Sequence, residues 1–514
     1  MIKGEKMNTK RTGFGTRTGF ALASAGSAIG LGNLWGFPYK VSSHGGAAYL
    51  FIYIACIALI GAVALIAEFN IGKNGKANAV TTYKKISPSM GWFGVLAIVI
   101  PFIIICYYYV LGGYTMKYAF NSYVGNAGNF HTFSANIGDV LLHTFVFAAI
   151  AYSIIAAGVH DGIEKASKIL MPSILFFLVV IIIFVVSLGE GVNDGLKYYL
   201  KPDFSSLTSS AVLSAMGQAF FSLSLGCGAM VAYSSYASEK IDIKRATVGV
   251  CVIDVLISLL IGVAIFPAIF HYSEVSGTPV TELGIGGEGG VGMMFEVMSM
   301  VFEEIPVIGR SVSLLFFAVA SFAAVTSVIS IIEVVTQFII QRHKIFRGRA
   351  AMIVTVLCFF ISVPVAISFG SKVNSGTAVT VFGVSLFDYL ETLTSTILMP
   401  ICALLSCVGA AKLIRAQGRA EGLFCVMVSW VTPALIIAVE VLGIYNIVMP
   451  EGKYSSGGMS IVISAFVIVA ICFLVYNLRM KKEDTGTNES ELEVMAMEAE
   501  KRRNGIQRGW SHPE

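Results

Sequence analysis

The sequence predicts an all-α integral membrane protein, on three observations. Hydrophobic residues make up 56% and charged residues 13% of the 514 residues, against about 45–50% and about 25% in soluble proteins. The mean hydropathy is +0.79, so much of the surface must face lipid. Apolar runs of about 20 residues, the length of a membrane-spanning helix, recur along the chain. A soluble enzyme, a coiled coil and a disordered scaffold are excluded, and the small net charge of +4 does not indicate nucleic-acid binding.

Twelve spans are predicted, which places both termini on the same side of the membrane. The runs are rich in Leu, Ile, Val, Phe and Ala and lack the alternation of barrel strands, so we interpret them as helices. Their ranges are 14–41, 47–71, 92–122, 139–158, 166–189, 210–236, 245–271, 310–341, 350–370, 378–411, 422–448 and 458–479.

Lysine and arginine concentrate on one side of these spans. The N-terminal stretch, the region between spans 4 and 5, the tail and the loops after spans 2, 6, 8 and 10 carry most of them, including Lys73, Arg245 and Arg347. Because cytoplasmic loops are enriched in these residues, both termini are predicted to be cytoplasmic. All nine cysteines fall in predicted spans, so no disulfide framework is expected.

Two spans contain residues that interrupt helices. Span 1 places Gly26, Gly30, Gly32 and Asn33 near its middle, and span 6 has serines and glycines within 221–228. A single Gly-x-x-x-Gly pair is typical of close helix packing. However, these two spans each begin a block of five, spans 1–5 and 6–10. Glycine-interrupted helices at corresponding positions of two halves indicate an inverted-repeat transporter, so broken helices are predicted at spans 1 and 6.

These residues also resemble a known family. Residues 26–38 resemble the first-span signature of the neurotransmitter:sodium symporter family, 217–226 its sixth-span signature and 323–327 its eighth-span sodium motif. Gly162 and Pro172 match a fifth-span pattern of the same family. The resemblance covers spans 1 to 10 in order.

The resemblance implies the LeuT fold, with two inverted five-helix repeats followed by helices 11 and 12. The expected regions are a cytoplasmic N-terminal segment (1–13), two repeats (14–190 and 191–411), helices 11 and 12 (412–480) and a cytoplasmic tail (481–514) whose ending resembles the start of an affinity tag. The short second outer loop, about 123–138, lacks the cysteine pair and glycosylation sites of animal members, so a bacterial inner (cytoplasmic) membrane is expected.

The implied function is sodium-coupled symport of an amino acid or amine by alternating access. Expected partners are a small-molecule amino acid and membrane lipid, with no nucleic acid, and the protein is expected to be a monomer or a weak dimer. A proton-coupled transporter or an exchanger with the same fold is the alternative. A channel is not favoured because only midplane polar clusters are found, and no enzyme motif is present.

Two Na⁺ sites are implied by the resemblance. One, Na2, uses Gly26, Ile29, Ala323, Thr326 and Ser327. The other, Na1, uses Ala28, Asn33, Ser222 and Asp254. The residues themselves agree in part, because adjacent Thr and Ser in an apolar helix offer two hydroxyl ligands. The alternative is that both hydroxyls bond carbonyls of their own helix.

Asp254 is an ionisable residue inside an apolar span, which marks it as a functional candidate. Many relatives carry Asn at this position, and chloride-dependent relatives carry Ser one turn later, as Ser258 is here. We expect Asp254 to bind Na⁺ and to supply the negative charge that chloride supplies elsewhere, so that chloride is not required. The alternative is a protonated structural aspartate. Glu68 and Glu333 are interpreted as bonding partners inside the bundle.

The substrate hypothesis depends on the absence of an acidic residue in span 1. Monoamine transporters of this family carry an Asp in span 1, and residues 26–38 contain no acid, so the substrate should bring its own carboxylate. The candidate substrate-binding residues are Ser27, Ala28, Gly30, Leu31, Gly32, Ile104, Tyr108, Phe221, Ser222, Ser224, Cys227, Ser327 and Ile331. Cys227 stands where some relatives have a bulky aromatic residue, so a hydrophobic or aromatic L-amino acid such as tyrosine, tryptophan or leucine is expected.

Gate residues follow the family only in part. Asp388 is at the position of the acid in the outer gate, but Gly36 occupies that of the arginine. Outer closure is therefore expected to use aromatic packing, water or another cation. Gly162 and Pro172 fit a cytoplasmic hinge, and the alternative is a proline near the start of a helix that does not move.

Overall fold

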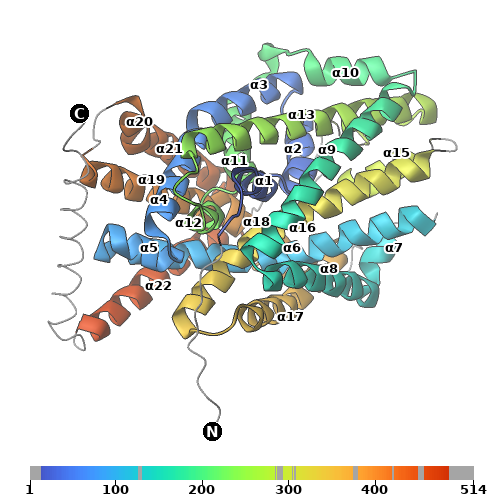
Figure 1. The fold of residues 1–514 in the computed structure, drawn as a ribbon. Coiled ribbons are helices and arrows are strands. Elements are labelled where there is room, and N and C mark those ends of the chain that lie inside the picture. The colour runs from blue at the N-terminus through green and yellow to red at the C-terminus, as the bar shows by residue number, and fades with distance from the viewer. Residues whose placement is uncertain are drawn as a thin grey trace, which may run out of the picture.

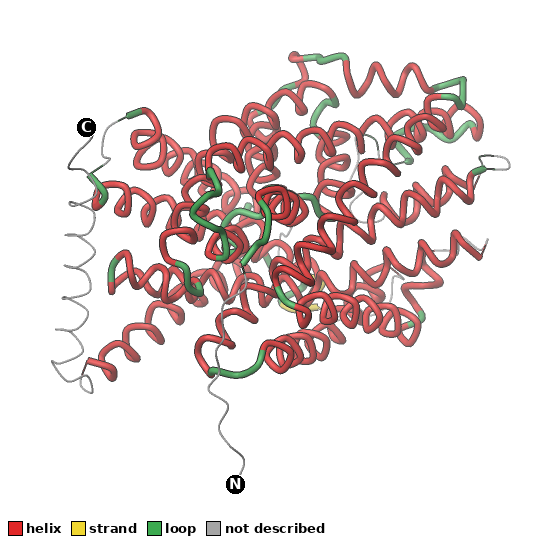
Figure 2. Tube along the Cα trace, in the orientation of Figure 1, coloured by secondary structure: helices red, strands yellow, loops and turns green. Residues whose placement is uncertain are grey.

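The computed structural model describes residues 13–124, 130–283, 285, 293–303, 305, 308–373, 380–418, 422–449 and 457–484. These residues are almost entirely helical (Figures 1 and 2). Within them, ten helical segments are long and apolar enough to cross a membrane. The predicted N-terminal segment, except residue 13, and most of the predicted tail lie outside the described residues.

The ten candidate spans follow the predicted ranges closely. They are Ala47–Gly75, Pro88–Val124, Ile137–Ala157, Val159–Val186, Ile243–Ser276, Gly309–His343, Arg347–Gly370, Leu386–Ala416, Leu423–Val448 and Gly458–Arg479.

Individual helices and short π- or 3₁₀-helical segments (η) build these spans and the connections between them. In chain order they are α1 (Arg17–Ala28), η1 (Gly32–Gly36), α2 (Phe37–Ser43), α3 (Ala47–Cys56), η2 (Ile57–Gly61), α4 (Ala62–Gly75), α5 (Ala79–Ile86), η3 (Pro88–Met90), α6 (Gly91–Val124), α7 (Phe130–Ala135), α8 (Ile137–Ala157), η4 (Val159–Glu164), α9 (Lys165–Val186), α10 (Val192–Leu200), η5 (Phe204–Ser206), α11 (Ser209–Ser222), α12 (Ala229–Ser235), α13 (Ile243–Ser276), η6 (Met293–Val297), α15 (Met298–Glu303), α16 (Gly309–His343), α17 (Arg347–Val373), α18 (Leu386–Thr392), η7 (Leu393–Leu398), α19 (Met399–Ala416), α20 (Leu423–Val426), η8 (Met427–Val431), α21 (Thr432–Val448) and α22 (Gly458–Asp484).

Polar side chains define where several helices begin. Thr16 accepts a hydrogen bond from Gly19 N at the start of α1, and Asn78 accepts one from Thr81 N at the start of α5. Thr208 does the same for Ala211 N at α11. Each cap satisfies one of the four amides that a helix start leaves without an intrahelical partner.

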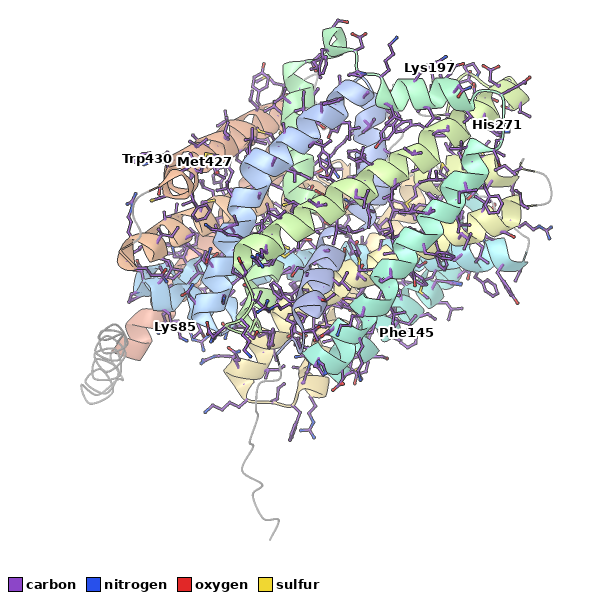
Figure 3. The ribbon with its side chains drawn as sticks, turned by 45° about the horizontal axis from the view of Figure 1, so that its top comes forward. Lys85, Phe145, Lys197, His271, Met427 and Trp430 are labelled. Atoms are coloured by element: carbon purple, nitrogen blue, oxygen red, sulfur yellow. The ribbon has the colours of Figure 1, made fainter. Side chains whose placement is uncertain are left out.

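The outer surface of the bundle is apolar and its two ends are polar. Phe145 on α8 and Trp430 on η8 are 57% and 71% exposed, and Figure 3 shows both on the flanks of the bundle. Lys197 and His271 lie toward one end of the molecule and Lys85 toward the other (Figure 3). This distribution fits a protein whose flanks face lipid.

Two predicted spans are interrupted. Helix α1 ends at Ala28, Ile29 is extended with φ −84° and ψ 100°, and helical structure resumes at Gly32. Helix α11 ends at Ser222, and the next helix, α12, begins at Ala229. Neither half of either segment reaches span length, so these two segments are not among the ten spans.

The prediction that the tenth span begins at residue 378 is wrong. Strand β1 (Thr380–Val381) pairs antiparallel with β2 (Val384–Ser385), and the helix begins only at Leu386. The turn between the strands has φ 52° at Phe382 and φ 81° at Gly383. Positive φ at both central residues is the geometry of a tight hairpin turn, so the apolar run was misread as helix.

Candidate functional site

The two interrupted segments meet near the middle of the bundle, against α16. The Ser224 hydroxyl donates to the Ser27 carbonyl at 2.7 Å. The Ser27 hydroxyl in turn donates to Ser330 on α16 at 2.7 Å, and Ser330 donates to the Ser327 carbonyl at 2.6 Å. The first bond satisfies a carbonyl at the end of α1 that has lost its helical partner, and the other two connect this end of α1 to α16.

The second interruption depends on glycine. Gly226 has φ 77°, and a Cβ there would lie 2.0 Å from the carbonyl oxygen of Met399. Its N–H donates to the Glu68 carboxylate at 2.8 Å. Glu68 is buried and also lies 3.3 Å from the Ser406 hydroxyl. The expectation that Glu68 is a bonding partner inside the bundle is therefore confirmed.

A cavity of about 40 Å³ lies between the two interruptions. Every predicted substrate residue except Leu31 and Ser222 lines it, and Asn33 and Met399 line it as well. The Leu31 N–H donates to the Tyr108 hydroxyl at 3.1 Å, next to the cavity. Met399 was not predicted, because a single methionine in an apolar span carries no signal of its own.

The walls of the cavity pack closely. A Cβ on Gly32 would lie 2.4 Å from the Phe221 ring, and one on Gly30 would lie 2.4 Å from the Ser327 hydroxyl. Since one buried water needs about 10–15 Å³ of such volume, the cavity holds roughly three waters. A bound amino acid therefore requires the surrounding rings to move apart.

A buried carboxylate with three hydrogen-bond donors around it adjoins the cavity. Asp254 on α13 is 0% exposed and accepts hydrogen bonds from the Asn33 amide at 2.8 Å and the Tyr53 hydroxyl at 2.8 Å. Ser222 donates to it at 3.3 Å. Three of the four predicted Na1 residues thus meet directly, while Ala28 lines the adjoining cavity. Tyr53 was missed, because its contact with Asp254 crosses two hundred residues of sequence.

No ion pair reaches Asp254 within the described residues. Burying a carboxylate without a compensating positive charge is costly. The hydroxyl and amide donors around it offset part of that cost. The carboxylate and the hydroxyl oxygens of Tyr53 and Ser222 form a set that a hard cation such as Na⁺ can bind.

A second cluster of oxygens lies where α1 ends against α16. The Ser327 hydroxyl is 3.4 Å from the Gly26 carbonyl oxygen and 3.2 Å from that of Ile29. The Thr326 hydroxyl donates to Ala323 O at 3.0 Å and to Phe322 O at 3.1 Å. Of the five predicted Na2 residues, Ser327 thus meets Gly26 and Ile29 across the helices, while Thr326 and Ala323 bond to each other within α16. The alternative of bonding to its own helix holds for Thr326, whereas Ser327 faces span 1.

A lysine takes part in the contacts near Gly36. Lys40, one turn later, donates to the Gln218 side chain at 2.8 Å, and Gln218 donates to the Gly32 carbonyl at 3.0 Å. Asp388 accepts a hydrogen bond from Ser385 at 2.6 Å. Outer closure was expected to use aromatic packing, water or another cation. Lys40 is a cation available for this role at this end of span 1.

At the other end, Glu333 is buried and accepts a hydrogen bond from Tyr236 at 2.7 Å. It also forms an ion pair with Arg347. The expectation that Glu333 is a bonding partner inside the bundle is confirmed. Gly162 lies in η4, where a Cβ would be 1.9 Å from Ile154 O, and Pro172 lies inside α9.

Comparison with known proteins agrees with this geometry. The family model described as the Sodium:neurotransmitter symporter family matches residues 11–128 and 123–483. The chain is 33% identical over 401 residues to the uncharacterized sodium-dependent transporter YhdH of Bacillus subtilis, covering 76% of this chain and 85% of that protein. It is 31% identical over 494 residues to an uncharacterized sodium-dependent transporter of Methanocaldococcus jannaschii, covering 91% of this chain and 96% of the relative.

A solved structure is also similar. The crystal structure of MhsT in complex with L-phenylalanine matches with a TM-score of 0.74 and 30% identity, covering 84% of this chain and 99% of MhsT. The fold, the site and these similarities agree with the expected family. The chain therefore belongs to the Sodium:neurotransmitter symporter family and is a sodium-dependent transporter, not an enzyme.

Proposed function

We propose that the protein is a sodium-coupled symporter that imports a hydrophobic or aromatic L-amino acid by alternating access. The observation that carries this proposal is the meeting of the two interrupted segments at one small cavity, flanked by two oxygen clusters. In transporters, freed carbonyls at such breaks bind Na⁺ and freed N–H groups bind an anionic substrate group.

The proposed architecture is the LeuT fold with twelve spans. Segments 17–43 and 209–235 would be broken helices 1 and 6, added to the ten continuous spans. Residues 14–190 and 191–411 would form the two inverted repeats, with 412–480 as helices 11 and 12. The proposed location is the bacterial inner membrane with both termini cytoplasmic, as a monomer or a weak dimer.

Two Na⁺ ions would bind at the two oxygen clusters. One would bind Asp254 with Asn33, Ser222 and Ala28, and the other would bind the carbonyls of Gly26, Ile29 and Ala323 with Thr326 and Ser327. The buried charge of Asp254 supports chloride-independent transport, because the negative charge is already in the protein.

The substrate carboxylate would lie at the Leu31 and Gly32 N–H groups and the Tyr108 hydroxyl. This agrees with the lack of any acid in 26–38, where an amine without a carboxylate would need one. The small side chain of Cys227 in the cavity wall supports a large apolar substrate. The L-phenylalanine in the MhsT structure belongs to the same chemical class.

The decisive experiment is uptake of radiolabelled amino acids into proteoliposomes containing the purified full chain. A Na⁺ gradient should drive accumulation of tyrosine, tryptophan or leucine, and replacing chloride by gluconate should leave it unchanged. Uptake driven equally by a proton gradient in the absence of Na⁺ would instead favour the proton-coupled alternative. Preference for glycine or alanine would contradict the proposed substrate class.

A further inference from the structure

An apolar crevice separate from the central cavity opens on the flank of the bundle. It has a volume of about 250 Å³ and lies between α8, α9, α16 and α6. Ile150 and Ile154 of α8 face Ile169 and Leu170 of α9 across it. Ile169 is 67% exposed and Ile150 36% exposed, so the crevice opens to the surface that faces lipid.

The bottom of the crevice is also apolar. Phe322 and Val325 of α16 line it, and Val325 is only 6% exposed. Ser321 supplies the one hydroxyl in the lining, and this donates to the Phe317 carbonyl of its own helix at 2.8 Å. A water molecule needs two to four polar partners to be retained in a cavity, and this lining offers too few.

The position of the crevice identifies its occupant. Its walls are membrane spans, so whatever enters from the side comes from the bilayer. Ile154 lies near the end of α8 and Leu170 near the start of α9, so the crevice reaches the end of the spans where Lys165 is exposed and paired with Asp161. A phospholipid whose headgroup lies at this end could extend one chain inward.

We propose that the crevice binds an acyl chain of a membrane phospholipid. The chain would pack on Ile154 and Leu170 and end against Phe322 and Val325. Val325 directly precedes Thr326, so the acyl chain would end next to the oxygen cluster formed by Thr326 and Ser327.

The bound chain would support a weak part of α9. Pro172 has no N–H, so the carbonyl one turn earlier lacks its usual helical partner. The preceding segment is π-helical and follows Gly158, which has φ 104°. The turn 165–171 therefore depends more than most on packing, and the acyl chain supplies it on the side of the crevice.

Photo-crosslinking tests the site directly. The full chain is reconstituted in vesicles of phosphatidylethanolamine and phosphatidylglycerol that contain a phosphatidylglycerol with a mid-chain diazirine. Mass spectrometry should find adducts on Val325, which is only 6% exposed, and on partly buried Phe322, as well as on exposed Phe176. Adducts on Phe176 without any on Phe322 and Val325 would overturn the proposal.

Variants that fill the crevice provide the matched comparison. Ala166→Phe narrows the crevice from α9, and Ile154→Phe narrows it from α8. If one variant fails to fold, the other still tests the site. Each should lower labelling of Phe322 and Val325 at least about fivefold while labelling of Phe176 is unchanged. Val179→Phe, at a 43% exposed position on α9 outside the crevice, should change neither. Unchanged labelling in both filled variants would contradict an acyl chain in this crevice.

Hydrogen exchange gives a second readout that does not depend on transport. Amides of 165–171 should exchange more slowly in vesicles than in a short-chain detergent, and Ala166→Phe should slow them in detergent as well. Equal exchange in the two environments would show that no chain supports this turn. Photo-crosslinking and hydrogen exchange do not depend on the proposed function. That proposal is tested by the uptake experiment alone.

Discussion

The side-chain amide of Asn33 donates a 2.8 Å hydrogen bond to the carboxylate of Asp254. Asn33 belongs to the first interrupted span and Asp254 to the continuous helix α13. The bond therefore ties the segment after the break in span 1 to the long helix α13.

Replacing Asp254 by Asn tests the role of its charge. The substitution keeps the size of the side chain and removes the negative charge. A hydrogen bond to a charged group is worth about 1.5–3 kcal/mol, and we take the contact between the carboxylate and Na⁺ to be at least this strong. The apparent Na⁺ affinity should therefore fall at least about tenfold. Uptake should also become stimulated by chloride, measured as a Na⁺ titration in chloride and in gluconate.

Ser258→Ala is the control for this prediction. Ser258 lies beside Asp254 and accepts a hydrogen bond from Asn33 at 2.9 Å, but it carries no charge. Its loss should leave transport independent of chloride. If Asp254→Asn kept both the Na⁺ affinity and the chloride independence of the native chain, the carboxylate would not be the substitute for chloride.

The interruptions and most of the cavity could be predicted from sequence, because glycine combined with Ser or Asn in an apolar run is a local signal. Tyr53 and Met399 could not be predicted, since each reaches the site only through packing between distant spans. The hairpin 380–385 was missed for a different, local reason. Its turn depends on positive φ at Phe382, a residue type that rarely adopts it.

The hydroxyl of Ser327 can be tested by Ser327→Ala. This hydroxyl faces carbonyls of Gly26 and Ile29 across the boundary between α16 and α1. Its loss should weaken one of the two proposed Na⁺ sites, so the Na⁺ dependence of uptake should become less steep and approach that of a single site. The Na⁺ concentration for half-maximal uptake and the Hill coefficient are measured together.

Ser321→Ala serves as the comparison on the same helix, because that hydroxyl bonds only within α16 at 2.8 Å among the contacts of the described residues. It should leave the steepness unchanged. An unchanged Hill coefficient in Ser327→Ala would mean that the cluster at Thr326 and Ser327 holds no coupled ion.

The small side chain of Cys227 leaves the space in the cavity that the proposed large substrates need. Cys227→Phe adds a ring to a wall that already encloses little space, and overpacking typically costs about 1–3 kcal/mol. Tyrosine and tryptophan should then compete with a labelled substrate at least about fivefold less well, while alanine should improve relative to them. Cys227→Ser, of nearly equal size, should keep the native order of preference.

Lys40 can be tested as the cation of outer closure. Its contact with Gln218, which in turn bonds the Gly32 carbonyl, connects it to the first interruption. Lys40→Ala should speed release of bound radiolabelled substrate from the purified protein severalfold, measured by dilution and filtration. Lys40→Arg retains the charge and should restore most of the slow release. Equal release rates in all three proteins would exclude a role in closure.

The Arg347–Glu333 pair makes a prediction about stability rather than transport. Glu333 is 0% exposed, and Tyr236 donates to it at 2.7 Å. Removing one partner of a buried pair leaves the other charge uncompensated and costs about 3–5 kcal/mol. Arg347→Ala should therefore lower the thermal midpoint in detergent markedly. Adding Glu333→Gln should recover part of the loss, since the neutral amide still accepts the Tyr236 hydroxyl. If the double variant were as unstable as Arg347→Ala alone, lost packing of the arginine, not the stranded charge, would be the cause.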